Sequence, residues 1–201
     1  MIKKFFHSVV VILALSIGGT AYAGVMFNPI NAGSSVSATL EDFDVFGFDT
    51  CPGCTIAATL KDLDAQTAML NVGDTVSFDF FDITVGGSGV DFFDIAATLA
   101  FASPGGSASD TGSGGFGSIS TIFGTYSGGV LGWSGPVFVD LGHTAFTVAF
   151  EEGIALGEGD TATVGASVTL DRVTKVPEPG TLALLGIGLA GLGLMRRKQR
   201  A

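Results

Sequence analysis

Apolar and polar residues alternate over much of the chain between residues 35 and 171, and this pattern predicts β-strands. A period of two places the apolar residues of a strand on one face and the polar residues on the other. The pattern is cleanest in residues 161–171, where Ala, Val and Leu alternate with Thr, Ser and Asp. We predict strands at residues 35–40, 55–60, 75–80, 119–126, 130–133, 137–141, 144–151 and 161–171. With glycine turns between them, these strands predict an all-β fold, either an antiparallel β-sandwich or a jelly-roll-like body.

Two local features refine this prediction. The pentapeptide DFFDI occurs at residues 79–83 and again at 91–95, on either side of the glycine-rich stretch 86–89. Two alternating runs around such a turn predict an antiparallel hairpin, and the doubled Phe predicts a β-bulge on each arm. Residues 103–117 are mostly Gly and Ser, a composition that predicts a flexible loop because it offers little to bury.

The amino end has the pattern of a signal peptide. Lys3 and Lys4 precede an apolar stretch at residues 9–17, and Ala21 and Ala23 supply the small residues that signal peptidase requires. We therefore predict a signal peptide at residues 1–23, followed by a single exported domain at residues 24–175.

The carboxyl end, residues 176–201, has three parts in direct succession. Pro177, Glu178 and Pro179 precede an uncharged run at residues 181–195. The basic residues of the tail follow: Arg196, Arg197, Lys198 and Arg200. As a helix, the uncharged run would cover about 22 Å, which is less than the ~30 Å thickness of the hydrocarbon core. We therefore expect a transmembrane helix that is unusually short. The basic tail favours the cytoplasmic side, which places the preceding domain across the membrane.

This arrangement resembles the PEP-CTERM sorting signal, in which a Pro-Glu-Pro motif, a short hydrophobic helix and an arginine-rich tail end the chain. The resemblance implies that exosortase, a membrane cysteine transpeptidase-like enzyme, recognises Pro177, Glu178 and Pro179 and removes the tail. It implies export through the inner membrane, transient anchoring by the helix, and then a place at the cell surface or outside the cell. Like a GPI signal, the tail would serve as an address rather than as a lasting anchor.

The net charge of the exported part limits the classes of partner that it can bind. Residues 24–179 contain three basic residues, Lys61, Arg172 and Lys175, against nineteen acidic ones, a net charge of −16. Nucleic acids and anionic lipid surfaces are bound through basic contacts, so this charge excludes nucleic acid as a partner. The same charge keeps a protein soluble and attracts cations.

Few residues are candidates for chemistry. Cys51 and Cys54 enclose a Pro-Gly turn, and in an exported protein this spacing predicts a local disulfide. A redox dithiol, a zinc site and free thiols are the alternatives, but no βαβ unit and no second cysteine pair accompany the motif. The acid pairs Asp42/Asp44 and Asp62/Asp64 offer oxygen ligands for Ca²⁺ without matching an EF-hand, and solvated turns are the alternative. No other cofactor is expected.

Catalytic motifs are absent from the sequence. His143 is the single histidine after residue 23, and no GxSxG, HExxH, phosphate-binding or dinucleotide motif gives it partners. A hydrolase using two carboxylates would need them about 5–9.5 Å apart, which a sequence does not reveal. Most aromatic residues are Phe at alternating positions and are expected in the core, whereas Trp133, close to glycines, is the candidate for a sugar contact.

We therefore expect a non-enzymatic surface or extracellular-matrix protein, processed by signal peptidase and exosortase. The resemblance further implies an association with extracellular polysaccharide, biofilm or floc. Two alternatives stay open: a carbohydrate-binding or Ca²⁺-dependent binding module, and a polysaccharide or ester hydrolase.

Overall fold

The computed structural model describes residues 24–41, 44–46, 48–121, 124–152 and 161–174, and within these ranges the chain forms only strands and turns. The strands are β1 (Val25–Glu41), β2 (Asp44–Val45), β3 (Phe48–Asp49), β4 (Thr55–Leu60), β5 (Ala68–Leu70), β6 (Thr75–Gly86), β7 (Gly89–Ser103), β8 (Ser107–Thr121), β9 (Gly124–Trp133), β10 (Val137–Asp140), β11 (Thr144–Phe150) and β12 (Thr161–Val173). The all-β prediction is confirmed. The predicted signal peptide and sorting segment lie outside the described residues. Inside the described ranges, no helix has the length and hydrophobicity needed to cross a bilayer.

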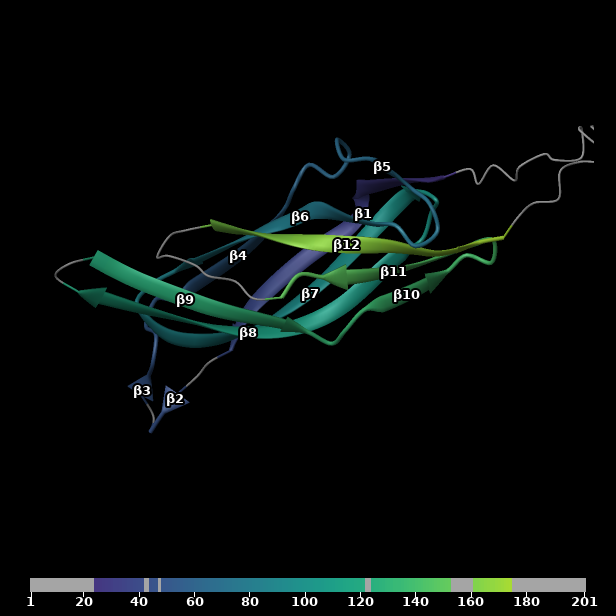
Figure 1. Cartoon of the computed structure of the whole chain (residues 1–201). Helices are drawn as coiled ribbons and strands as arrows, with labels where there is room; N and C mark the ends of the chain where they lie inside the picture. Colours follow the sequence, from purple (N-terminus) through teal and green to yellow (C-terminus); the bar gives the residue numbers. More distant parts are fainter. Residues whose placement is uncertain (1–23, 42–43, 47, 122–123, 153–160, 175–201) are drawn as a thin grey trace, which may run out of the picture.

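Two five-stranded antiparallel sheets make up the body (Figure 1). The first sheet has the strand order β5-β1-β7-β8-β9, and the second has the order β10-β11-β12-β6-β4. Strands β2 and β3 form a separate small hairpin beyond one end of the sheets. The sheets curl around one core that is rich in Phe, because alternate residues of both sheets point inward. The largest fully buried side chains include Phe27, Phe80, Phe81, Phe93 and Phe146.

The connection between β6 and β7 crosses from one sheet to the other. Strand β6 pairs with β4 and β12, whereas β7 pairs with β1 and β8. The predicted hairpin is therefore wrong. The crossover is tight because Gly87 and Gly89 have positive φ angles of 102° and 148° and lie under the Cys51–Cys54 turn. A Cβ atom at Gly87 would lie 2.8 Å from the Cα of Cys54, so glycine is required there.

The two copies of DFFDI have different geometries. In β6 the register moves from Val164 opposite Phe81 to Gly165 opposite Asp79, which leaves Phe80 as the extra residue of a bulge. In β7 no register shift occurs at Phe92. The bulge prediction is thus confirmed for the first copy and wrong for the second.

Most of the predicted glycine-rich loop is strand β8, which lies between β7 and β9 in the first sheet. Gly112 and Gly114 face the core, and a Cβ atom at Gly114 would collide with the ring of Phe93 and the carbonyl oxygen of Val130. Glycine therefore makes room for large side chains from the neighbouring strands. The single strand predicted at residues 119–126 is also wrong, because β8 ends at Thr121 and β9 begins at Gly124.

Candidate functional site

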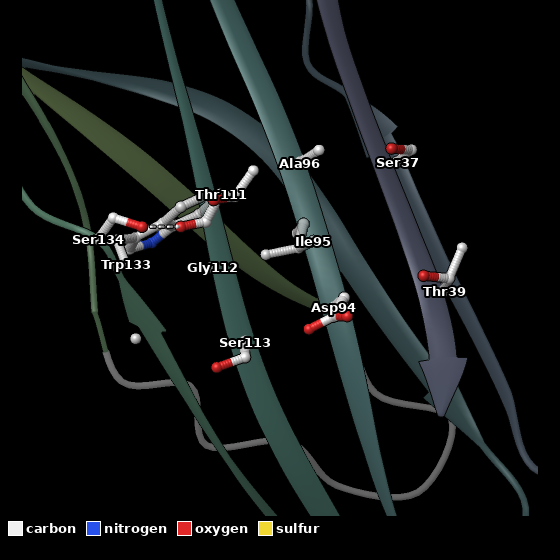
Figure 2. Close-up of a pocket in the computed structure, with 11 residues that line it drawn as sticks. Ser37, Thr39, Asp94, Ile95, Ala96, Thr111, Gly112, Ser113, Trp133 and Ser134 are labelled. Carbon is white, nitrogen blue, oxygen red and sulfur yellow. Dashed lines mark hydrogen bonds between the residues drawn. The ribbon is translucent and has the colours of Figure 1, made fainter. Parts of the chain in front are cut away.

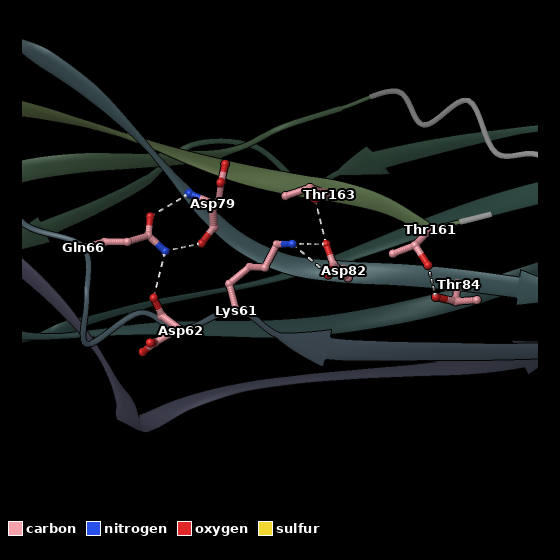
Figure 3. Close-up of polar contacts among 8 residues, drawn as sticks. All are labelled: Lys61, Asp62, Gln66, Asp79, Asp82, Thr84, Thr161 and Thr163. Atoms are coloured by element: carbon pink, nitrogen blue, oxygen red, sulfur yellow. Dashed lines mark hydrogen bonds and ion pairs between the residues drawn. The ribbon is translucent and has the colours of Figure 1, made fainter.

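The outer face of the second sheet is held together by its own polar side chains. Hydroxyl and carboxylate groups pair across neighbouring strands: Thr75 with Thr169, Thr84 with Thr161, Thr163 with Asp82, and Thr147 with Asp171. Lys61 Nζ forms an ion pair 2.8 Å from the carboxylate of Asp82 (Figure 3). Cross-strand pairs of this kind stabilise a sheet. These paired polar groups of the face therefore serve the structure of the sheet.

The pKa values of two carboxyls on this sheet follow from those contacts. Partial burial raises the pKa of Asp82, but hydrogen bonds from Lys61 and Thr163 and the positive charge of Lys61 outweigh it, and the pKa lies below its usual range. The backbone N–H of Gly142 and the guanidinium of Arg172 lower the pKa of Asp140. Both carboxylates are thus kept ionised by structural partners.

The predicted Ca²⁺ ligands are divided between several places. Asp62 and Asp64 lie in the β4–β5 connection. The Asp62 carbonyl accepts a hydrogen bond from the Gln66 side chain (3.3 Å; Figure 3). Asp64 Oδ1 accepts one from the Asn31 N–H (3.2 Å). Asp44 belongs to β2, and Asp42 lies outside the described residues. Among the described residues, no group of three or more His, Cys, Asp or Glu is placed to hold a metal ion.

Cys51 and Cys54 are joined as a disulfide, with their Cα atoms 5.5 Å apart. The N–H of Cys54 donates to the Cys51 carbonyl (3.0 Å), which closes the Pro-Gly turn. The turn packs over Gly87 and Gly89, so it covers the crossover between the two sheets. Its position is structural, and neither cysteine lines the groove described next.

The outer face of the first sheet contains an open groove (Figure 2). Its volume is about 620 Å³, and a second hollow of about 290 Å³ continues from it along β1, β7 and β8. The groove is lined by Ser37, Thr39, Asp94, Ile95, Ala96, Thr111, Gly112, Ser113, Gly132, Trp133 and Ser134. The hollow adds Ser35, Thr98 and Ser109 among others. Small and hydroxyl-bearing side chains therefore dominate the surface.

Strand register explains why the groove forms here. Ser37 lies opposite Ala96, which lies opposite Thr111, and these outward residues are all small. In the next outward row Thr39, Asp94 and Ser113 lie side by side on β1, β7 and β8. From Ser35 to Thr39 a strand rises about 13 Å, so the groove and the adjoining hollow together extend at least this far along β1.

Some polar side chains of this groove have partners, since Ser134 Oγ donates to the Thr111 carbonyl (2.9 Å), but three have none among the described residues. Within the described residues, no hydrogen bond or ion pair involves the hydroxyls of Ser37 and Thr39 or the carboxylate of Asp94. Thr98 and Ser109, by contrast, share a hydrogen bond of 2.9 Å. The groove therefore presents hydrogen-bonding groups outward, whereas many of those on the second sheet are paired with one another.

An apolar surface formed by Phe92 and Val130 adjoins the groove on the same face. Phe92 lies two residues before Asp94 on β7 and is 40% exposed. Gly115 of β8 lies opposite Phe92, and Val130 of β9, which is 68% exposed, lies opposite Gly115. A Cβ atom at Gly115 would lie 2.9 Å from the Phe92 ring, so the ring covers the backbone of β8. Sequence reasoning missed both Phe92 and the groove.

The structure places Trp133 at the end of the groove with its ring directed into the fold. The indole N–H donates to the Glu151 carbonyl (2.9 Å), and the ring packs against Phe150 at a centroid distance of 4.9 Å and Phe81 at 6.4 Å. Replacing Trp133 would therefore disturb the core as well as the groove. His143 lies in the β10–β11 turn, where its carbonyl accepts a hydrogen bond from the N–H of Thr174 (2.7 Å).

Thr174 is the last described residue and directly precedes the sorting segment. Residues 175–198 match the family model of the PEP-CTERM protein-sorting motif. No curated protein and no solved structure matches the chain. The matched range includes Pro177, Glu178, Pro179 and the basic residues Arg196, Arg197 and Lys198; Arg200 and the predicted signal-peptidase residues Ala21 and Ala23 lie outside both the match and the described residues. The chain therefore carries a PEP-CTERM protein-sorting motif and is an exported protein that exosortase sorts.

Proposed function

We propose that this protein is a non-enzymatic surface or matrix protein whose β-domain binds extracellular polysaccharide through the groove of the first sheet. The sorting motif supports a place outside the inner membrane. The observation that carries the binding proposal is the contrast between the two sheets. One outer face pairs many of its hydroxyls and carboxylates across strands, and the other directs Ser37, Thr39 and Asp94 into a groove.

The chemistry of the groove suits a sugar polymer. Sugar hydroxyls both donate and accept hydrogen bonds, and so do the hydroxyls of Ser37 and Thr39, while the Asp94 carboxylate accepts only. The C–H face of a sugar ring is apolar and fits against the face of an aromatic ring such as that of Phe92. An open surface that extends along the strands accommodates a chain better than a small enclosed ligand, which calls for a concave pocket.

The same groove gives little support to hydrolysis. Glycoside hydrolases place two carboxyl groups on either side of the bond to be cut. Asp94 lines the main groove, and Asp110 of the adjoining hollow is engaged with the backbone, because its carboxylate oxygens accept hydrogen bonds from Thr111 (2.8 Å) and Gly135 (3.3 Å). A binding role is therefore the better supported proposal.

Replacing Phe92 with Ala is expected to weaken polysaccharide binding about 3- to 10-fold, as the loss of one aromatic contact implies. The matched control is Phe138→Ala, because Phe138 is 60% exposed on β10 of the second sheet. Affinity electrophoresis of the exported protein in gels containing polysaccharide secreted by the producing cells measures the effect. Equal losses in both variants, or no retardation of the wild type, would reject the groove as the binding site. Loss of binding with a chelator would instead favour the Ca²⁺-dependent alternative.

Processing at both ends is tested by mass spectrometry of protein recovered outside the cell. We expect Gly24 at the amino end and loss of the residues after about Pro179. Glu178→Ala should leave the tail attached, because it alters the Pro-Glu-Pro motif, whereas Glu152→Ala removes the same charge outside the matched range and should be processed normally. Exported protein that retains its chain through Ala201 would show that the helix is a lasting anchor.

A further inference from the structure

We infer that the groove prefers uncharged glycan chains over anionic ones, and that Asp94 is the residue that determines this preference. The inference rests on the function proposed above and adds the chemical class of the ligand. Its grounds are the distribution of charge over the two sheets and the position of Asp94 in the groove.

The first sheet offers no positive charge to an anionic ligand. Its strands β1, β5, β7, β8 and β9 contain no Lys, Arg or His, and their acidic residues are Glu41, Asp91, Asp94 and Asp110. The two Lys or Arg residues within the described ranges pair with carboxylates of the other sheet: Lys61, which directly follows β4, pairs with Asp82, and Arg172 pairs with Asp140. A carboxylated or sulfated sugar in the groove would therefore find no cation among the described residues to neutralise it.

Asp94 lies on β7, between β1 and β8, in the row of groove-lining residues nearest to Phe92. Thr39 of β1 lies on one side of it and Ser113 of β8 on the other (Figure 2). A chain that extends from the groove to Phe92 passes over this carboxylate. Because the carboxylate has no partner within the described residues, it is available to accept hydrogen bonds from sugar hydroxyls, and bonds to a charged acceptor are stronger than neutral ones.

The same carboxylate opposes an anionic sugar. A ligand carboxylate held in the groove would bring a like charge within a few ångströms of Asp94, where salt screens the repulsion less than at long range. The total charge of −16 over residues 24–179 also repels a polyanion, but that long-range effect weakens as the salt concentration rises. The salt dependence therefore separates a local effect of Asp94 from a general effect of net charge.

The test uses the exported protein and three pairs of soluble polymers, each a neutral glucan and its carboxymethyl derivative, built on cellulose, dextran and β-glucan backbones. For a backbone that binds, we expect the neutral form to bind at least about 10-fold more tightly, at physiological and at about 0.5 M salt. Asp94→Asn should weaken binding of the neutral form several-fold and bring the ratio between the two forms close to one. Asp62→Asn is the control, because it removes the same charge from an exposed residue of the β4–β5 connection.

Each outcome has a distinct meaning. Equal binding of neutral and carboxymethyl polymers by the wild type, or an unchanged ratio in Asp94→Asn, would overturn the inference and leave the proposed binding function intact. A preference that disappears at high salt, or that Asp62→Asn reduces equally, would assign it to net charge and also overturn the role of Asp94. Failure of every polymer to bind would count against the proposed function itself.

Discussion

Replacing Phe80 with Ala is expected to lower the free energy of unfolding by about 3–5 kcal/mol, the usual cost of removing a buried Phe side chain. Phe80 is 0% exposed, stacks on Phe150 at a centroid distance of 5.4 Å and packs edge-on against Phe81 at 5.3 Å. The second position of the other DFFDI copy is Phe92, and Phe92→Ala should cost less than about 1 kcal/mol. It is 40% exposed and covers Gly115 instead of filling the core.

Urea denaturation followed by tryptophan fluorescence measures both variants, since Trp133 packs against Phe150 and reports on the core. Both changes remove the same atoms from the same pentapeptide, so effects on the unfolded chain are closely matched. Phe80→Leu provides a milder change for conditions in which Phe80→Ala is too unstable to fold. Similar costs at Phe80 and Phe92 would contradict the bulge at the first copy and the exposed position of the second.

Strand positions were predictable because the period of two is a direct consequence of having one buried face. The prediction at residues 55–60 coincides with β4, and the prediction at 161–171 lies within β12. The inward set of β12 is also confirmed, since Val164, Val168 and Leu170 are buried. Alternation identifies which face of a strand is buried, and it does so from neighbouring residues alone.

Strand pairing was not predictable in the same way, as the two DFFDI copies show. The difference between them depends on what lies opposite: in β6 the bulge at Phe80 meets Val164 and Gly165, and the N–H of Gly165 donates to Glu151 (3.2 Å). These residues are more than 70 positions away in the sequence. A local pattern contains no information about such partners, so identical pentapeptides received identical and partly wrong predictions.

The groove was missed for a related reason. Its outward Ser and Thr residues on β8 alternate with glycines, and a Gly/Ser composition indicates a loop when the neighbouring strands are unknown. Alternating hydroxyl residues at 35, 37 and 39 were a usable signal, but they acquire meaning only beside β7 and β8. The sorting motif, in contrast, depends on the order of residues at the chain's end, and it was recognisable from sequence.

Replacing Gly114 with Ala is expected to destabilise the protein by about 1–3 kcal/mol or more, the range for forcing extra atoms into a packed core. Gly114 lies between Phe93 of β7 and Leu131 of β9, and its added Cβ would collide with the Phe93 ring and the Val130 carbonyl oxygen. The ring can rotate away in part, but the carbonyl belongs to the backbone of β9. Strand β8 must therefore shift relative to β9.

Gly128→Ala is the control, because Gly128 is an exposed glycine of β9 with no atom within 4 Å of an added Cβ. It should be neutral or slightly stabilising, since Ala restricts the unfolded chain more than Gly does. Urea unfolding measures the stability of both variants. Adding Phe93→Leu to Gly114→Ala should recover only the part of the lost stability that the clash with the Phe93 ring causes. Full recovery would show that the backbone contact is unimportant. Because Ser113 of the groove directly precedes Gly114, a shift of β8 should also weaken polysaccharide binding, which links the core-facing glycines of β8 to the shape of the groove on the outer face.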